Sequence, residues 1–308
     1  MNTRFELVLH GANPASLRSA AEAALAEVER IENLLSLFRA SSEIARVNAL
    51  AAREAVRVSP EVFALLQHAE RLTRETDGAF DITLAPLLHC WGLLGRSDGH
   101  VPSAAELAAA RDVCGMGLVA LDRANFTVRF ARDGVMLDLG AIGKGYAVEK
   151  AVETLREADV SSALIHGGTS TVYALGTRPE ADAWKVAIGT PVPGQPLSSF
   201  GTVALRDESL SVSTVFGKCF VAQGRTRGHV IDPRTGEPAS DALLAALALP
   251  SGTETDALST ALLVVGPGGY DRVAALRPGM RTLLTSGDGA GGVHCLARGI
   301  EPTPPLVV

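Results

Sequence analysis

The stretch Val135-Met-Leu-Asp-Leu-Gly-Ala-Ile-Gly-Lys-Gly-Tyr146 decides the fold. It reads as an apolar strand over 136–139, a glycine-rich turn, and a helix from about Gly143 to Glu157. Backbone N–H groups at a helix N-terminus attract anions, and a cation there is unfavourable unless an anion is near. The position of Lys144 therefore favours a phosphate-bearing ligand, although a solvated lysine in a structural turn remains an alternative.

The glycines of this stretch differ from those of common nucleotide-binding motifs. Asp138 stands where a P-loop requires glycine, and Gly145 stands where it requires Ser or Thr. The segment 266–270 lacks the third glycine of a dinucleotide-binding fingerprint. The chain also contains no His-Glu-x-x-His and no Gly-x-Ser-x-Gly sequence. Kinase, dehydrogenase, hydrolase and metalloprotease functions of the familiar types therefore lose support.

The sequence on either side predicts helices mainly early and strands mainly from residue 117 onward. Predicted helices cover 14–37, 42–48, 60–76, 143–157, 255–265 and 270–276, and a capping box at Ser103 and Glu106 begins another. Predicted strands cover 3–10, 56–58, 118–121, 127–130, 136–139, 163–166, 172–175, 185–188, 203–205, 211–214, 243–249, 281–285 and 293–297. No Pro/Ser-rich linker divides the chain. We therefore expect an α+β chain forming a single domain over 1–308, which allows two integrated lobes.

Composition limits the partners and the location. The net charge of −6 disfavours a dedicated nucleic-acid binder, which needs a basic patch. The most apolar run, 242–249, is far shorter than the ~20 residues that cross a bilayer, so no membrane span is expected. Arg4 and Glu6 interrupt the apolar N-terminal residues, so we expect no signal peptide and a cytoplasmic location.

Two further segments combine turn chemistry with polar side chains. Gly78-Ala-Phe-Asp-Ile-Thr83 suits a helix end and turn, or alternatively a carboxylate and exposed backbone at the mouth of a ligand cleft. In Gly228-His-Val-Ile-Asp-Pro-Arg-Thr-Gly236, turn chemistry explains the residues from Asp232 onward. It does not explain His229, which is either structural or catalytic.

A possible cation site lies near the start of the predicted helix at 255–265. Asp256 and Thr260 are four residues apart, so a helix places both side chains on one face. Asp256 could simply cap the helix. Alternatively, a carboxylate and a hydroxyl, together with backbone carbonyls, offer the oxygen ligands that Mg²⁺ prefers.

Taken in this order, these segments resemble the ApbE-like family of FAD:protein FMN transferases. The resemblance covers nearly the whole chain, through Met1–Thr3, Leu35–Phe38, Ser42–Ile44 with Asn48, Gly78–Trp91, Asp138–Tyr146, Gly167–Gly168, His229–Gly236 and Asp256–Thr260. It implies an ApbE-like flavin transferase fold, with helices early and mixed or antiparallel strands later. It also implies that FAD is cleaved at its pyrophosphate, that FMN moves to a Ser or Thr hydroxyl of an acceptor flavoprotein, and that AMP leaves.

The resemblance also implies roles for individual residues. Those that bind FAD are Met1, Phe38 (where the family usually has tyrosine), Ala79, Phe80, Asp81, Asp138, Lys144, His229 and Val230. Those that bind Mg²⁺ are the carbonyl of Ala141, Asp256, Thr260 and the carbonyl of Ser259. The catalytic pair is His229, as the base that deprotonates the acceptor hydroxyl, and Asp256.

The chain departs from the family pattern in three places. Many members carry a lipoprotein signal, whereas this sequence starts directly at the first predicted strand. Val215–Lys218 replace the usual small residues after Thr214, and Thr169 follows the glycines where Asn is more common. The last two departures bear on the acceptor groove or adenine pocket, and so on the identity of the acceptor.

Two other functions stay open. One is a Mg²⁺-dependent FAD pyrophosphatase that uses water as the acceptor and yields FMN and AMP. The other is a flavin-binding protein without turnover. Retention of Lys144, Asp256 and Thr260 favours the two enzymes over the binding protein.

Overall fold

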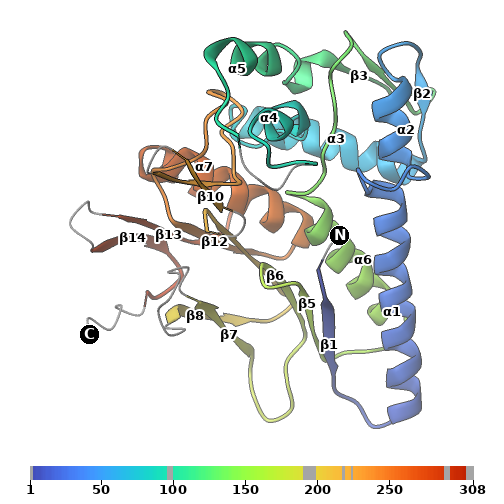
Figure 1. Cartoon of the computed structure of the whole chain (residues 1–308). Helices are drawn as coiled ribbons and strands as arrows, with labels where there is room; N and C mark the ends of the chain where they lie inside the picture. Colours follow the sequence, from blue (N-terminus) through green and yellow to red (C-terminus); the bar gives the residue numbers. More distant parts are fainter. Residues whose placement is uncertain are drawn as a thin grey trace. The chain divides into compact units, whose positions relative to one another are not determined.

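The computed structural model describes residues 3–95, 100–189, 199–216, 219–222, 225–287 and 292–302. They group into two compact units, drawn together in Figure 1. The first comprises Met1–Glu32, Ile142–Thr214 and Asp241–Val308, and the second comprises Asn33–Ala141 and Val215–Ser240. The expectation of a single domain, or of two integrated lobes, stays a prediction.

A seven-stranded antiparallel sheet forms the centre of the first unit. Its order is β1-β5-β6-β9-β12-β13-β14, with the bounds β1 Phe5–Leu9, β5 Ala163–Gly167, β6 Thr171–Leu175, β9 Glu208–Thr214, β12 Leu244–Leu249, β13 Arg281–Gly287 and β14 Val293–Arg298. The unit also contains a hairpin of β7 (Trp184–Gly189) and β8 (Ser199–Leu205). Its helices are α1 (Pro14–Leu35), α6 (Gly143–Glu157) and α7 (Gly252–Ala274), although the last turn of α1, from Asn33 on, belongs to the second unit.

The two faces of this sheet have different partners. Leu210 of β9 and Ala246 of β12 belong to an apolar core that includes Phe200 and Val203 of the hairpin. On the opposite face, β9 and β12 pack against α7. β12 is buried throughout because it lies between these two layers, which explains its uninterrupted apolar sequence.

Helices α6 and α7 approach each other unusually closely at their N-terminal turns. A Cβ added to Gly145 would lie 2.0 Å from the carbonyl oxygen of Gly252 and 2.7 Å from the Cβ of Asp256. Each helix also caps the other. The Asp256 carboxylate of α7 accepts from the Gly145 N–H of α6 at 3.0 Å. In return, the Glu149 carboxylate of α6 accepts from the Thr253 N–H of α7 at 2.8 Å.

This reciprocal capping has a physical basis. The first N–H groups of a helix have no partner within the helix, and the N-terminus carries partial positive charge. A carboxylate from the neighbouring helix meets both needs. The Ser251 and Thr253 hydroxyls add two further hydrogen bonds to Glu149, at 3.0 and 2.8 Å.

Helix α7 is interrupted where the sequence predicts separate helices. Gly266 has φ 59° and ψ −162°, which are not helical values, and Pro267 follows it. Glycine tolerates this positive φ, and proline cannot donate to the preceding turn. The two predicted helices are therefore joined at a kink.

The second unit is mainly helical. It contains the helices α2 (Glu43–Leu50), α3 (Pro60–Glu75), α4 (Ala85–Cys90) and α5 (Ala104–Arg111), the 3₁₀ turn η1 (Met116–Leu118), a sheet of order β2-β4-β3 (Val56–Arg57, Thr127–Phe130, Val119–Asp122) and the hairpin of β10 (Cys219–Ala222) and β11 (Arg225–Gly228). Ser42, Ser59 and Ser103 cap α2, α3 and α5, and the predicted capping box with Glu106 is confirmed.

The strand predicted at 136–139 is wrong. The segment has no regular secondary structure and pairs with no strand of the described chain. Instead, the Asn48 side chain accepts from the Leu137 N–H at 2.8 Å and donates to the Leu137 carbonyl at 2.9 Å. The Asp138 N–H donates to the Ile82 carbonyl at 2.7 Å. An amide side chain thus replaces one rung of a strand ladder.

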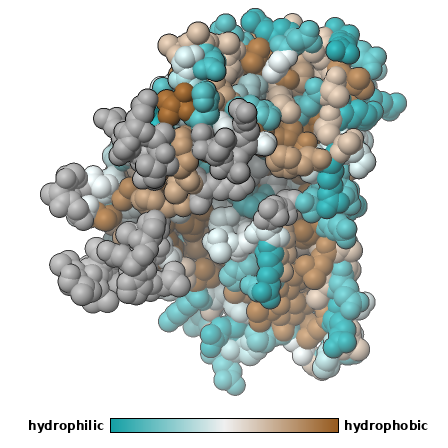
Figure 2. Space-filling model, viewed as in Figure 1, coloured by the Kyte–Doolittle hydropathy of each residue, from teal (hydrophilic) through white to brown (hydrophobic). Residues whose placement is uncertain are grey.

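None of the described helices combines the length and the apolar character that crossing a bilayer requires. Figure 2 shows hydrophilic and hydrophobic residues interspersed on the visible face. Among the described residues, the large apolar side chains exposed to solvent are Val8, Leu25, Phe38 and Leu296. The expected cytoplasmic location stays a prediction.

We predict that Gly145→Ala lowers the unfolding free energy by roughly 1–3 kcal/mol, because its methyl group would collide with backbone of α7. Gly268→Ala is the matched control: a Cβ there meets nothing within 4 Å, so stability should rise by up to about 1 kcal/mol. Urea denaturation followed by circular dichroism measures both. Equal stability of the two variants would contradict the close contact between α6 and α7.

Candidate functional site

The Asp256 carboxylate is the centre of a polar cluster in the first unit. Its side chain is only 5% exposed. The Lys144 ammonium lies 3.1 Å from Oδ1 and 3.4 Å from Oδ2, and the Gly145 N–H donates to Oδ2 at 3.0 Å. The Thr171 hydroxyl donates to Oδ1 at 3.4 Å. A buried charge is tolerated when it is paired and hydrogen-bonded, and both conditions hold here.

The remaining predicted cation ligands of α7 lie one turn beyond Asp256. The Ser259 and Thr260 hydroxyls donate to the Asp256 carbonyl at 3.1 and 3.2 Å. The Ser213 hydroxyl lies 2.9 Å from that of Ser259 and 3.2 Å from that of Thr260. Because both hydroxyls of α7 donate to the Asp256 carbonyl, Ser213 donates its single proton to one of them or shares it between the two. The structure therefore brings Lys144, Asp256, Ser259 and Thr260 together.

This donor set fits Mg²⁺. It offers a carboxylate, hydroxyls and carbonyls, which are the hard oxygen ligands that Mg²⁺ takes together with several waters. The described part of the chain contains no group of three or more His, Cys, Asp or Glu side chains that could hold a metal ion. A cation here would depend on one carboxylate and neutral oxygens, a chemistry that suits Mg²⁺ better than zinc.

The structure changes the interpretation of Lys144. The sequence places a lysine at a helix N-terminus and favours an external anion beside it. In the folded chain Asp256 supplies an anion, so the position of Lys144 does not by itself require a ligand. The ion pair escaped the sequence because 112 residues separate its members.

A network of buried hydroxyls lies behind Asp256, and sequence reasoning missed it. Ser211 of β9 donates to Thr171 at 3.4 Å and lies 3.2 Å from the hydroxyl of Thr255, on α7. Thr255 in turn lies 3.1 Å from Ser209, whose hydroxyl donates to the Val172 carbonyl. The only signal in the sequence is the alternation Ser209, Ser211, Ser213, which places three hydroxyls on one face of a strand.

In the second unit, the segment around Asp81 is buried rather than open. Ala79 and Phe80 are almost fully covered, and Asp81 is 7% exposed. Asp81 accepts from the backbone and hydroxyl of Thr83 at 2.8 and 2.6 Å, and from the Met116 N–H at 3.1 Å. Burial raises the pKa of this carboxyl, and the hydrogen bonds from Thr83 and Met116 oppose the rise. The Asp81 carboxylate is therefore not open to solvent, and whether this segment borders a ligand cleft stays a prediction.

Asp138 and Ala141 occupy the turn that leads into α6. The Gly140 N–H donates to the Asp138 carboxylate at 2.8 Å, which shapes the turn. Ala141 comes two residues before the first residue of α6. Whether Asp138 binds FAD and the Ala141 carbonyl binds a cation stays a prediction.

The segment after β11 divides into a tight turn and a half-buried histidine. Asp232 and Arg234 form a bidentate ion pair, with distances from Nε to Oδ1 of 2.9 Å and from Nη2 to Oδ2 of 2.7 Å. This hydrogen bonding raises the pKa of Arg234. The Gly236 N–H donates to the Asp232 carbonyl at 2.7 Å and closes the turn. His229 and Val230 precede the turn, half-buried, and the Val230 carbonyl accepts from the Ala239 N–H.

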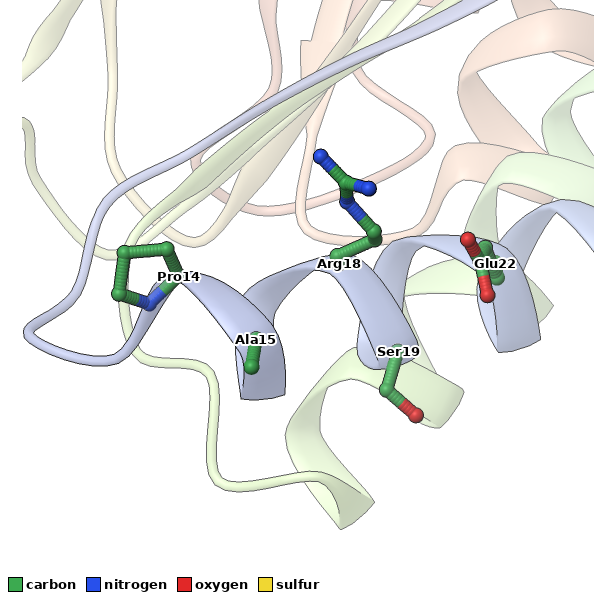
Figure 3. A pocket seen from close by; sticks show the side chains of 5 residues that line it. All are labelled: Pro14, Ala15, Arg18, Ser19 and Glu22. Atoms are coloured by element: carbon green, nitrogen blue, oxygen red, sulfur yellow. The ribbon is translucent and has the colours of Figure 1, made fainter.

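Other predicted residues have diverse surroundings. The Phe38 side chain is 78% exposed. Met1 lies outside the described residues. So do Gly217 and Lys218, which belong to the segment Val215–Lys218 that departs from the family pattern. A hollow of about 400 Å³ is lined by Pro14, Ala15, Arg18, Ser19 and Glu22, all from the start of α1 (Figure 3). None of the predicted site residues lines it.

Comparisons with known proteins identify a family. A sequence model of the ApbE family matches residues 1–284. A protein of Treponema pallidum named FAD:protein FMN transferase is 34% identical over 281 residues, covering 85% of this chain and 76% of that protein. One of Klebsiella pneumoniae with the same name is 32% identical over 216 residues, covering 70% of this chain and 66% of that protein.

Solved structures agree with the sequence matches. The ApbE protein of Thermotoga maritima superposes with a TM-score of 0.84 at 28% identity, covering 95% of this chain and 93% of that one. The flavinyl transferase ApbE of Pseudomonas stutzeri gives a TM-score of 0.78 at 28% identity, covering 96% and 95%. The expected α+β fold of the ApbE type is thereby confirmed.

We predict that His166, the residue before Gly167 at the end of β5, makes stability depend on pH. Burial lowers its pKa below 6.5, so the folded protein holds the imidazole neutral. The unfolded chain then binds the proton first, and stability falls as pH drops below about 6.5. In His166→Gln this contribution is absent. On acidification, the unfolding free energy of the wild type should fall relative to that of His166→Gln by at most ~1.4 kcal/mol per pH unit. A constant difference between pH 7.5 and pH 5.5 would disprove the contribution.

Proposed function

The chain belongs to the ApbE family, and we propose that it catalyses Mg²⁺-dependent transfer of FMN from FAD to a Ser or Thr hydroxyl of an acceptor flavoprotein, with release of AMP. The names of its relatives support flavin transfer. The Mg²⁺ requirement, the acceptor hydroxyl and the release of AMP are inferred from the site and from the family resemblance.

The cluster of Lys144, Asp256, Ser259 and Thr260 is the observation that carries this proposal. It combines an ammonium and a buried carboxylate beside the first turn of α6 with two hydroxyls one turn further along α7. Pyrophosphate cleavage requires positive charge around the phosphates and a cation ligand set of hard oxygens. A protein that merely bound the flavin ring would need neither.

The residues that would hold Mg²⁺ are Asp256, Thr260 and the carbonyls of Ala141 and Ser259. When bound, the ion supplies a Lewis acid that withdraws charge from phosphate oxygens. Thr260 suits this role because its proton is donated to the Asp256 carbonyl, which leaves one lone pair besides the one that faces Ser213.

The proposed chemistry balances as a substitution at phosphorus. The acceptor oxygen forms a bond to the FMN phosphorus, and the bond from that phosphorus to the bridging oxygen breaks. The electron pair stays on the bridging oxygen, which leaves as part of AMP. The hydroxyl proton passes to a base. Lys144 and the N-terminus of α6 stabilise the negative charge that develops on the phosphates.

His229 is the residue proposed to accept the proton of the acceptor hydroxyl. Asp232, the neighbouring carboxylate in sequence, is held by Arg234 in a bidentate pair and accepts from the Arg234 N–H as well. Both carboxylate oxygens of Asp232 are therefore already engaged by Arg234. His229 stands before the turn rather than within it, and an imidazole can accept a proton near neutral pH.

The remaining predicted residues are proposed to bind FAD. They are Met1, Phe38, Ala79, Phe80, Asp81, Asp138, Lys144, His229 and Val230. The exposed ring of Phe38 offers an apolar face for a flavin ring to stack on. Because Ala79, Phe80 and Asp81 are buried, we expect them to shape the binding surface through backbone and packing rather than through free side chains.

The proposal is tested by incubating the protein with FAD, Mg²⁺ and a candidate acceptor flavoprotein, and then weighing the acceptor intact. Transfer adds the mass of one FMN less one water and releases one AMP. Free FMN and AMP with an unchanged acceptor would identify a pyrophosphatase instead. Bound, intact FAD with no AMP would identify a flavin-binding protein.

We predict that Asp256→Asn lowers transfer by at least ~10²-fold, because an amide keeps the shape but removes the charge that holds the cation. Glu153→Gln is the control, since this acid on α6 pairs only with Lys150 among the contacts described and is half exposed. EDTA should abolish wild-type transfer and Mg²⁺ should restore it. Full activity of Asp256→Asn would remove Asp256 from the cation site.

We predict that His229→Ala lowers single-turnover transfer by ~10²-fold or more while FAD affinity changes little. In the wild type, the rate should rise with pH through the imidazole pKa, ordinarily ~6.5, because the base must be neutral. Asp232→Asn serves as the comparison and should retain the pH dependence. A His229→Ala variant that transfers at the wild-type rate would assign the proton to another group.

A further inference from the structure

The Asp256 carboxylate has no lone pair left for a cation in the structure as it stands. Lys144, Gly145 and Thr171 make four contacts with its two oxygens, at 3.0–3.4 Å. A carboxylate offers about four lone-pair sites in total. A cation can therefore coordinate Asp256 only when one of these donors withdraws.

The three donors differ in their freedom to withdraw. The Gly145 N–H belongs to the first turn of α6, where the backbone is pressed against Gly252. Thr171 is 2% exposed on β6, between β5 and β9. Lys144 stands on a flexible four-carbon chain, and its side chain is 24% exposed. Lys144 is thus the donor that can leave without disturbing the helix or the sheet.

We propose that the Lys144 ammonium and a divalent cation exchange at Asp256. Without the cation, Lys144 neutralises the buried carboxylate. When the cation binds, it takes over that neutralisation, and its charge repels the ammonium. Lys144 then becomes available to the pyrophosphate of FAD. The same residue therefore neutralises Asp256 when no cation is bound and contacts the phosphates when one is. This inference rests on the proposed function, because it takes Asp256 as a cation ligand.

If the two cations exchange, replacing Lys144 should strengthen Mg²⁺ binding, whereas replacing a residue that helps to bind Mg²⁺ would weaken it. Removing Lys144 removes the competitor and its repulsion, so Mg²⁺ should bind more tightly in the absence of flavin. The loss of its ammonium should at the same time weaken FAD binding. A lysine that merely supported the cation site would give weaker Mg²⁺ binding.

The test is calorimetric titration of Mg²⁺ alone, without flavin, into the wild type, Lys144→Met and Lys150→Met. Lys150 is a matched control: it lies on α6, it is 26% exposed, and it pairs with Glu153 rather than with Asp256. Its removal changes the net charge equally. We expect the Mg²⁺ dissociation constant to fall about tenfold in Lys144→Met, within the 5–150-fold range of coupled binding events, and less than twofold in Lys150→Met.

A second readout follows from stability. Lys144→Met leaves a buried carboxylate unpaired until Mg²⁺ arrives, so its melting temperature should rise more on Mg²⁺ addition than that of the wild type. Lys144→Arg keeps the charge and should retain weak Mg²⁺ binding. If Lys144→Met does not fold, Lys144→Gln, which keeps a neutral donor, takes its place.

The outcomes separate this inference from the proposed function. Unchanged or weaker Mg²⁺ binding in Lys144→Met would overturn the exchange while leaving Asp256 as a cation ligand. Equal tightening in Lys150→Met would also overturn it, since a general charge effect would then suffice. A different result would overturn the proposed function alone. In that result the wild type binds Mg²⁺ but transfers no FMN, and Lys144→Met binds Mg²⁺ more tightly than the wild type.

Discussion

The crossing of α6 and α7 at Gly145 and Gly252 is the constraint on which the site depends. Neither glycine admits a side chain without meeting backbone of the other helix. This closeness lets Asp256 reach the first turn of α6 and lets Glu149 reach the first turn of α7. Each carboxylate satisfies backbone donors that water would otherwise have to serve. The same contact that joins the helices therefore fixes the candidate cation ligand beside its lysine.

Behind that crossing, the interior is polar where a helix usually meets a sheet through apolar side chains. Ser209, Ser211, Thr171 and Thr255 bury their hydroxyls between α7 and the strands β6 and β9. Small hydroxylated residues let the helix lie close to the sheet and bond with defined geometry. Buried networks of this kind hold their members in one arrangement when every group is satisfied. The arrangement keeps Asp256 from turning away from its donors.

Local signals in the sequence predicted much of the fold. Helix α6 has the bounds that its glycine turn indicates, and Ser59, Pro60 and Ser103 mark helix starts as their capping chemistry requires. Long-range pairings were beyond such signals. Asn48 takes the place of a strand partner at Leu137, 89 residues away, so the apolar sequence of this segment wrongly predicted a strand.

The candidate site shows the same division. Helical spacing placed Asp256 and Thr260 on one face, but the ion pair with Lys144 comes from tertiary structure. Similarly, the Gly78–Thr83 turn was visible in the sequence, while the burial of Asp81 depends on Met116 and Gly115, which approach only in the folded unit.

The order of the segments along the chain also has a consequence for biosynthesis. The first unit is built from three separate stretches, and α7 with β12, β13 and β14 comes from the last of them. The ribosome makes that stretch at ~5–20 residues per second. The residues of β9 are made before those of its neighbour β12, and Lys144 is made before Asp256, the carboxylate that pairs with it. The edge of β9 that pairs with β12, and the serine hydroxyls that face α7, therefore lack these partners until residues 244–274 have been synthesised. Lys144 can meet its carboxylate only after Asp256 has been synthesised, 112 residues later.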